Sequence, residues 1–187
     1  MEDKLLFFSA FMRYPKEIGS VVPSSKFLTD EILKNIDFKK AKYIAEYGPG
    51  TGRMTKEILK RARKDVKLLC FEINKKFCIY LRKNIKDKRL IIINDSAENV
   101  NKYIKKFNIP KIDYVISGLP FTNLKIDKKY QIIKETKNTL KTNGKFLVFQ
   151  FFLNNFKKYL HYYFSDISIK FVPLNIPPCF VYVCEKQ

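Results

Sequence analysis

Three glycines, two positions apart, follow a short apolar segment, and an acidic residue stands just ahead of them. Residues 46–52 read E-Y-G-P-G-T-G, with Glu46 before Gly48, Gly50 and Gly52. Glycine lets a backbone turn sharply and approach a ligand closely. A glycine run alone is weak evidence, because an ordinary loop can have the same composition. The groups that follow the next apolar segments are what favour a ligand site.

Acidic and small polar residues follow the next two apolar segments. Glu72 comes about 20 residues after the glycines, where an acid can accept hydrogen bonds from both hydroxyls of a ribose. Asp95, Ser96 and Ala97 follow the third segment, where a side chain can reach an adenine amino group. Three successive segments each supply a group suited to a nucleoside, and the sequence therefore predicts a nucleoside-cofactor site.

The apolar segments alternate with stretches of helical periodicity, such as the pair Met54 and Ile58. Strands are predicted at residues 43–47, 66–72, 90–94, 112–117, 145–152, 167–172 and 180–184. Strands alternating with helices indicate a parallel sheet covered on both faces. The Pro-rich link before the last strand is too short for a helical crossover, so the last two strands should pair antiparallel. We expect an α/β fold with a seven-stranded doubly wound sheet, whose ligands lie at the carboxyl ends of the strands.

The sequence also predicts where the helices of this fold lie and that the chain forms a single domain. Helices are expected after each of the first four strands, the last of them at 130–140, and at 154–164 after the fifth. Residues 4–14 should form an apolar helix ended by Pro15, and Ser24 or Ser25 should cap a second helix. The expected organisation is a single domain over 1–187, with an N-terminal helical segment at 1–36 and a Rossmann-like core at 42–187.

The charge of the chain is its strongest compositional feature. Its 187 residues include 37 Lys and Arg against 18 Asp and Glu, a formal net charge of +19. Hydrophobic residues make up 46%, which excludes wholesale disorder. Such a basic chain is drawn to polyanions, either nucleic acid or an anionic membrane surface. The charge does not choose between these partners, and a Lys-rich solvated surface would show the same balance.

The cysteine spacing, the apolar runs and the N-terminal residues each argue against a class of protein. The four cysteines lack C-x-x-C spacing, so we expect free thiols in a reducing cytosol and no metal site. The apolar runs at 5–12 and 146–153 are too short to span a bilayer. The opening M-E-D-K lacks the basic region of a secretory signal.

Two nucleoside cofactors compete for the predicted site. A dinucleotide fold requires G-x-G-x-x-G, but position 53 is Arg and the third glycine comes one residue early. The G-x-G-x-G form preceded by an acid resembles the class I methyltransferases that use S-adenosylmethionine. The resemblance implies that Glu46 lies near the methionine end, Glu72 holds the ribose and Asp95 contacts the adenine. The full predicted cofactor set is Glu46, Gly48, Gly50, Thr51, Gly52, Glu72, Ile73, Asp95, Ser96, Ala97, Ser117 and Gly118.

The loop after the fourth strand indicates the substrate. Residues 117–121 read S-G-L-P-F, which resembles the N-L-P-Y-type loop of the rRNA adenine dimethyltransferases. In that family the Asn holds the target amino group and the aromatic residue stacks on the base. Gly118 stands in place of the Asn, so the main polar contact to adenine is lost. Phe121 keeps the aromatic ring, which could equally be a core side chain under the loop.

Three segments together resemble the bacterial phospholipid N-methyltransferases, which methylate phosphatidylethanolamine. They are the opening F-x-R-x-P-x-x-I-G-S-V-V-P-S-S from Phe11 to Ser25, the E-Y-G-P-G-T-G motif, and S-G-L-P-F. The resemblance implies a peripheral protein of the cytoplasmic membrane face that binds anionic lipid through an N-terminal amphipathic helix. The 4–14 helix fits that role, although it could instead pack on its own domain.

The segment Y-L-H-Y-Y at 159–163 contains the only histidine. His161, Tyr159 and Phe121 are the predicted catalytic residues, and the histidine and tyrosines of this segment could hold a lipid phosphate or help to remove an ammonium proton. A lone histidine is equally an incidental surface residue. Two other functions stay open, which are an rRNA methyltransferase and a membrane-docked module without turnover. The intact set of glycines and acids argues against the latter.

Overall fold

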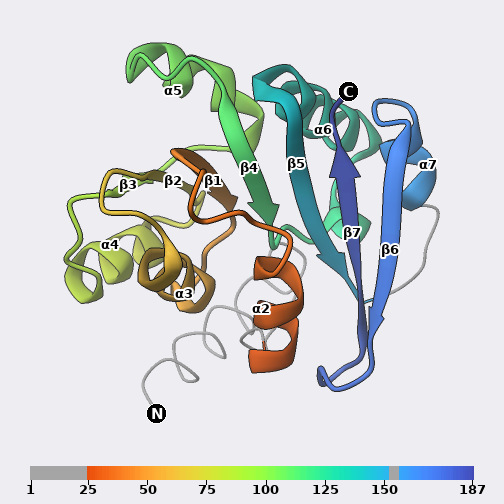
Figure 1. Cartoon of the computed structure of the whole chain (residues 1–187), viewed down its shortest axis with the longest axis horizontal. Coiled ribbons are helices and arrows are strands. Elements are labelled where there is room, and N and C mark those ends of the chain that lie inside the picture. The colour runs from red at the N-terminus through yellow and green to blue at the C-terminus, as the bar shows by residue number, and fades with distance from the viewer. Residues whose placement is uncertain (1–24, 152–155) are drawn as a thin grey trace.

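The computed structural model describes residues 25–151 and 156–187. They form a seven-stranded sheet with the order β3-β2-β1-β4-β5-β7-β6 (Figure 1). The strands are β1 (Tyr43–Tyr47), β2 (Lys67–Phe71), β3 (Leu90–Ile93), β4 (Ile112–Ser117), β5 (Leu140–Gln150), β6 (Asp166–Val172) and β7 (Cys179–Glu185). The first five pair in parallel, and β7 pairs antiparallel with both β5 and β6. The predicted sheet with its terminal antiparallel hairpin is confirmed.

Helices cover both faces of this sheet (Figure 1). They are α2 (Lys26–Leu33), α3 (Arg53–Arg61), α4 (Lys75–Asn84), α5 (Val100–Lys106), α6 (Ile126–Thr139) and α7 (Phe156–His161). Buried side chains of α2 and α3 form one apolar cluster with one face of the sheet. Buried side chains of α5, α6 and α7 form a second cluster with the other face. Two apolar layers thus hold the sheet between them.

The order of the strands reverses at β1, which lies between β2 and β4. Tyr47 at the end of β1 is level with Ser117 at the end of β4. The loops that leave these two strands turn to opposite faces of the sheet, and a crevice opens between such loops in this class of fold. The glycine motif and the S-G-L-P-F loop are these two loops, so the fold brings them together.

Three element boundaries differ from the sequence expectations. Helix α6 begins at Ile126 rather than residue 130 and runs directly into β5 at Leu140, because buried Leu140 pairs with Ile112 at the start of β4. Strand β5 therefore begins earlier than residue 145. Helix α7 ends at His161, where the amides of Tyr163 and Phe164 both turn back to the carbonyl of Leu160.

At the other end of the described chain, Ser25 caps α2. Its hydroxyl accepts a hydrogen bond from the Leu28 amide at 3.1 Å, as predicted for this serine. The predicted 4–14 helix lies outside the described residues. In the described ranges, no helix has the length and apolar character needed to cross a bilayer. The four cysteines are free and buried.

Gly52 is the position where the fold depends most on glycine. Its φ is +80°, and a Cβ there would lie 2.5 Å from the Leu81 side chain on α4 and 2.7 Å from the side chain of Ile85, which follows α4. We expect Gly52→Ala to lower the free energy of unfolding by at least about 2 kcal/mol, from the left-handed backbone and the overpacking together. Urea denaturation measures this loss, and an unchanged midpoint would contradict it.

Candidate functional site: the carboxyl edge of the sheet

The glycine motif forms a tight loop at the end of β1. Gly48, Gly50 and Gly52 all have positive φ, at 70°, 55° and 80°. The Gly48 amide donates to the Phe71 carbonyl at 2.9 Å, which ties the loop to the end of β2. Thr51 is buried within the loop. The three glycines have no side chains of their own, which allows the loop backbone to approach a ligand closely.

Glu46 is a buried carboxylate beneath this loop. It is 3% exposed, and burial raises its pKa to about 7. The Thr55 hydroxyl donates to Glu46 Oε2 at 2.7 Å, and the Cys70 thiol donates to the same oxygen at 3.3 Å. Among the described residues no donor contacts the other oxygen, Oε1. That oxygen is the one that can accept from a ligand.

Glu72 follows β2 and links the glycine loop to the start of α4. Its Oε2 accepts from the Gly50 amide at 3.3 Å, and its Oε1 accepts from the Asn74 amide at 2.9 Å. Burial raises the pKa of this carboxyl, and the two amides act in the opposite direction. The next residue, Ile73, is 58% exposed and offers an apolar surface beside the carboxylate.

The end of β3 lies against the end of β2. The Asn94 amide donates to the carbonyls of Glu72 and Ile73 at 2.8 and 3.0 Å. Asp95 Oδ1 accepts from Ser96 and Asn99, which hold the pKa of this carboxyl below its ordinary value. The next residue, Ala97, is buried. The structure therefore brings Glu46, the glycine loop, Glu72 and the Asp95 turn to one edge of the sheet.

The loop after β4 contacts the glycine loop directly. The Gly118 amide donates to the Tyr47 carbonyl at 2.9 Å. A Cβ at Gly118 would lie 3.3 Å from the Gly48 carbonyl oxygen and 3.5 Å from the Phe149 ring. Ser117 is buried, and its hydroxyl accepts from the Leu119 amide at 3.3 Å. The two loops meet through backbone atoms, and the Leu119 side chain also lies against the glycine loop, 3.2 Å from where a Cβ at Gly48 would be.

The three residues predicted to serve the substrate do not gather at this edge. Phe121 is fully buried, and its ring packs against Phe156 at 4.8 Å and Phe146 at 6.5 Å between centroids. The structure thus makes the Phe121 ring part of the core. Tyr159 is half-buried, with its ring 5.1 Å from that of Tyr130 on α6. His161 is exposed at the last residue of α7. Their catalytic roles stay predictions.

Comparison with known proteins identifies the family. Residues 16–161 match the model of the ribosomal RNA adenine dimethylase family. The chain belongs to this family. It is accordingly a class I methyltransferase, and its cofactor is S-adenosylmethionine, as the sequence predicts.

Individual relatives of this family member divide into two groups. The ornithine lipid N-methyltransferase of Singulisphaera acidiphila is 25% identical over 99% of this chain and 97% of its own length. Ribosomal RNA small subunit methyltransferase A of Mycoplasmopsis synoviae is 32% identical over 57% of this chain, and the match spans 38% of its own length. The chain therefore spans nearly the whole of the lipid enzyme and well under half of the rRNA enzyme.

Solved structures share the fold. The N-methyltransferase NodS of Bradyrhizobium japonicum, in complex with S-adenosyl-L-homocysteine, superposes with a TM-score of 0.71 at 7% identity over 95% of this chain and 98% of its own. TrmN of Thermus thermophilus superposes with a TM-score of 0.70 at 13% identity over 94% of this chain and 52% of its own. At these identities the likeness concerns the fold alone.

The residues at the carboxyl edge fit S-adenosylmethionine. The cofactor presents an ammonium and a sulfonium, two ribose hydroxyls and an adenine. Glu46 Oε1 can accept from the ammonium, and Glu72 can accept from the ribose hydroxyls. The exposed Ile73 side chain can pack on the adenine, and the bare backbone of the glycine loop leaves room for the methionine part.

Sequence reasoning missed the residues that hold these groups. Thr55 and Cys70 orient Glu46, and Tyr103 donates to Asp95 Oδ2 at 2.9 Å. Gln150 is 4% exposed and donates to the Leu119 carbonyl at 3.0 Å, which braces the loop after β4. Gln150 carried a signal, because it is the one polar residue in the run F-L-V-F-Q-F-F. The others gave no such signal, since their partners are distant in the sequence.

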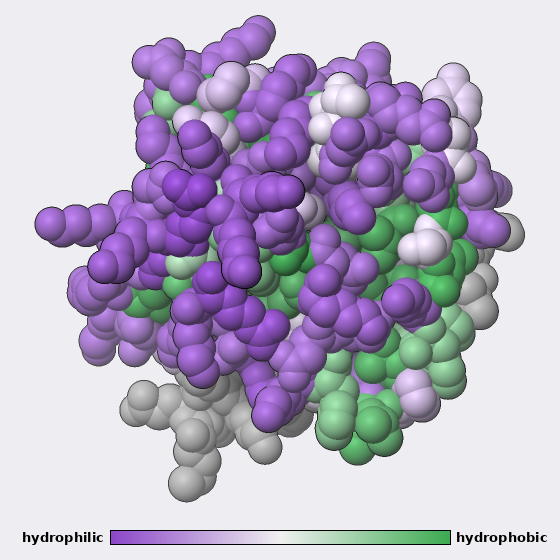
Figure 2. Space-filling view, viewed as in Figure 1, coloured by the Kyte–Doolittle hydropathy of each residue, from purple (hydrophilic) through white to green (hydrophobic). Residues whose placement is uncertain are grey.

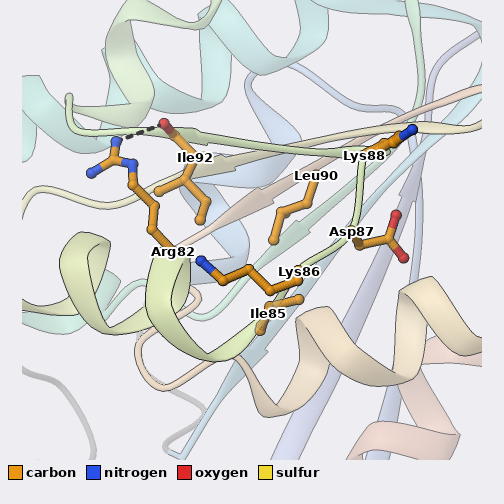
Figure 3. Close-up of a pocket in the computed structure, with 7 residues that line it drawn as sticks. All are labelled: Arg82, Ile85, Lys86, Asp87, Lys88, Leu90 and Ile92. Carbon is orange, nitrogen blue, oxygen red and sulfur yellow. Dashed lines mark hydrogen bonds between the residues drawn. The ribbon is translucent and has the colours of Figure 1, made fainter.

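A separate cavity of about 480 Å³ lies at the outer edge of the sheet, beside β3 (Figure 3). It is lined by Arg82, Ile85, Lys86, Asp87, Lys88, Leu90 and Ile92. Arg82 donates to the Ile92 carbonyl at 3.0 Å, so its guanidinium occupies an acceptor on the edge strand. No residue of the predicted cofactor set lines this cavity.

Proposed function

We propose that this methyltransferase transfers methyl groups from S-adenosylmethionine to the amine of phosphatidylethanolamine at an anionic membrane surface. The observation that carries the proposal is Gly118. The resemblance to the N-L-P-Y-type loop implies that an adenine-specific enzyme has an Asn at this position to hold the target amino group. Here the position has no side chain, and a Cβ would lie 3.3 Å from the Gly48 carbonyl oxygen. The entrance is therefore without the polar group that selects adenine.

The length of the match to the lipid enzyme supports the same substrate class. The relative named an ornithine lipid N-methyltransferase aligns over 97% of its length, so the chain has the extent of a lipid-directed enzyme. Ornithine lipid and phosphatidylethanolamine both present a primary amine on a membrane lipid. The basic surface adds to this, because a net charge of +19 favours an anionic bilayer. The expected location is the cytoplasmic face of the membrane.

The chemistry requires a neutral amine aligned with the transferable methyl group. The bound cofactor supplies that methyl on a sulfonium sulfur. The chain holds the glycine loop and the loop after β4 together through the Gly118–Tyr47 hydrogen bond, which fixes the crevice in which the two reactants meet. Catalysis then rests mainly on alignment and on exclusion of water. Proton removal by His161 or Tyr159 is proposed from the sequence, and it requires the substrate to reach α7.

Methylation of rRNA is the second candidate, and the family match and the charge both favour it. One experiment separates the two. The protein is incubated with methyl-labelled S-adenosylmethionine and, in parallel, with vesicles of phosphatidylethanolamine and phosphatidylglycerol, with ornithine lipid vesicles, and with unmethylated rRNA. Phosphatidylcholine vesicles, which have no free amine, are the matched control.

We expect label in phosphatidylethanolamine and none in phosphatidylcholine. Label confined to ornithine lipid would show that the substrate is another amine-bearing lipid, and it would overturn the proposal that phosphatidylethanolamine is methylated. Label in rRNA alone would replace the lipid proposal by the RNA one.

A further inference from the structure

The turn of the β6–β7 hairpin displays apolar side chains to solvent. Leu174 is 62% exposed and Ile176 is 78% exposed, and Phe171 just before the turn is 56% exposed. These three residues are called the hairpin tip below. Figure 2 shows hydrophobic residues gathered at this end of the hairpin, whereas hydrophilic residues cover most of the rest of this view. No charged residue occurs between Lys170 and Glu185, in a chain with 29% charged residues.

The turn is held in shape by a buried asparagine. Asn175 is 3% exposed and stands between the two exposed side chains. Its Oδ1 accepts from the Ser25 amide at 3.2 Å, and its Nδ2 donates to the Pro177 carbonyl at 2.6 Å. Because Asn175 is bonded inward to the start of α2, its neighbours Leu174 and Ile176 are directed outward. The exposed apolar side chains of Leu174 and Ile176 therefore belong to an ordered turn.

The hairpin tip lies on the same edge of the sheet as the cofactor site. Ser117 at the end of β4 pairs with Val148 on β5. Val148 in turn pairs with Tyr182 on β7, and Tyr182 pairs with Ile169 on β6. The hairpin continues beyond Ile169 through Val172, so its turn extends roughly 10 Å past the end of β4. Figure 1 shows this turn reaching beyond the tip of the β4 arrow. The hairpin turn therefore projects past the same edge of the sheet as the crevice, with β5 between the hairpin and β4.

Basic residues flank the hairpin tip. Lys170 precedes it on β6 and is half-exposed, 3.9 Å from Glu31. Lys26 follows Ser25, the residue bonded to Asn175, and is exposed. An apolar surface with cations at its border matches the interface of an anionic bilayer, where apolar groups enter among the acyl chains and cations meet phosphate.

We propose that the hairpin tip inserts into the interface of an anionic lipid bilayer and holds the entrance of the cofactor site against the membrane. The proposal rests on the lipid substrate proposed above, because a lipid amine must enter the crevice from the bilayer. It is distinct from an anchor in residues 4–14. Apolar patches of this kind also form contacts between protein copies, which the test distinguishes.

The test uses the absence of tryptophan from the chain. Leu174→Trp places a single fluorophore at the hairpin tip, and Ile79→Trp places one on α4 at a residue that is 56% exposed. With phosphatidylglycerol vesicles, we expect a blue shift of the Leu174→Trp emission and loss of that emission when the acyl chains are brominated. The Ile79→Trp emission should change little. Unchanged Leu174→Trp emission with brominated vesicles would overturn the proposal.

A second pair of variants measures the contribution to binding. Leu174→Ser combined with Ile176→Ser should lower the vesicle partition coefficient about tenfold, whereas Ile79→Ser should leave it unchanged. Equal partition of the double variant would overturn the proposal, as would a wild-type dimer that the double variant converts to a monomer. If the tryptophan inserts but no lipid is methylated, insertion stands and the proposed substrate fails. If lipid is methylated without insertion, the substrate stands and insertion fails.

Discussion

Glu72→Ala is expected to weaken S-adenosylmethionine binding about 10²–10⁴-fold while the protein stays folded. We propose that the carboxylate accepts from two ribose hydroxyls, and a hydrogen bond to a charged group contributes about 1.5–3 kcal/mol. Its oxygens also accept from the amides of Gly50 and Asn74, so the substitution loosens the glycine loop as well. Isothermal titration calorimetry measures the affinity, and circular dichroism verifies the fold.

Two variants serve as controls for this result. Glu57→Ala removes an acid from the surface of α3, where it pairs with Arg61 at 3.4 Å, and should leave the affinity unchanged. Glu72→Gln keeps one acceptor oxygen and should fall between wild type and Glu72→Ala. Wild-type affinity in a folded Glu72→Ala protein would remove Glu72 from the cofactor site.

Glu46→Gln is expected to stabilise the cofactor-free protein above pH 7 and to weaken cofactor binding about 10–100-fold. Burial raises the pKa of Glu46 from 4.5 to about 7, so the folded state retains a proton that the unfolded state loses from about pH 4.5 upward. The contribution of Glu46 to stability is therefore full below pH 4.5 and falls as the pH rises to about 7, by about 3 kcal/mol at most. Glutamine is neutral throughout and avoids this loss.

The same substitution removes the negative charge that we propose meets the cofactor ammonium. A positively charged ligand favours the ionised form of Glu46, so wild-type affinity should rise between pH 5.5 and pH 7.5, a range that brackets the pKa of about 7. In Glu46→Gln this rise should be absent. Urea denaturation at pH 5 and pH 8, with calorimetry at the same two values, provides both measurements. A wild-type protein equally stable at both pH values, or a variant that binds the cofactor as tightly, would contradict this role of Glu46.

The sequence predicted the strands that position the site and the residues at their ends, because the signals for these features are local. Short apolar segments separated by helical periodicity specify parallel strands, and parallel strands place their carboxyl ends on one edge. Glu46, Glu72 and Asp95 each stand at or just after such a segment, so their meeting required no knowledge of distant contacts. The positive φ values of Gly48, Gly50 and Gly52 follow likewise from the close spacing of the glycines.

Only the tertiary structure decided the surroundings of these groups. Burial raises the pKa of Glu46, and the hydrogen bonds from Thr55 and Cys70, which lie on other elements, act in the opposite direction. Phe121 follows a loop and shows nothing in the sequence that separates a substrate ring from a core ring. Its contacts with Phe146 on β5 and Phe156 on α7 place it in the core.

The β6–β7 hairpin also combines a feature that the sequence predicts with one that only tertiary packing decides. The short Pro-rich link predicted the antiparallel β6–β7 pair, because it leaves no room for a helical crossover. The distance by which the hairpin passes the end of β4 depends on the register of β5, β7 and β6, which is set by packing between strands far apart in the sequence. The sequence by itself therefore determined the fold class, the cofactor and the residues at the strand ends. Tertiary packing decided which groups hold each carboxylate, which aromatic rings are buried and how far the apolar turn passes the end of β4, because these depend on contacts that no local pattern encodes.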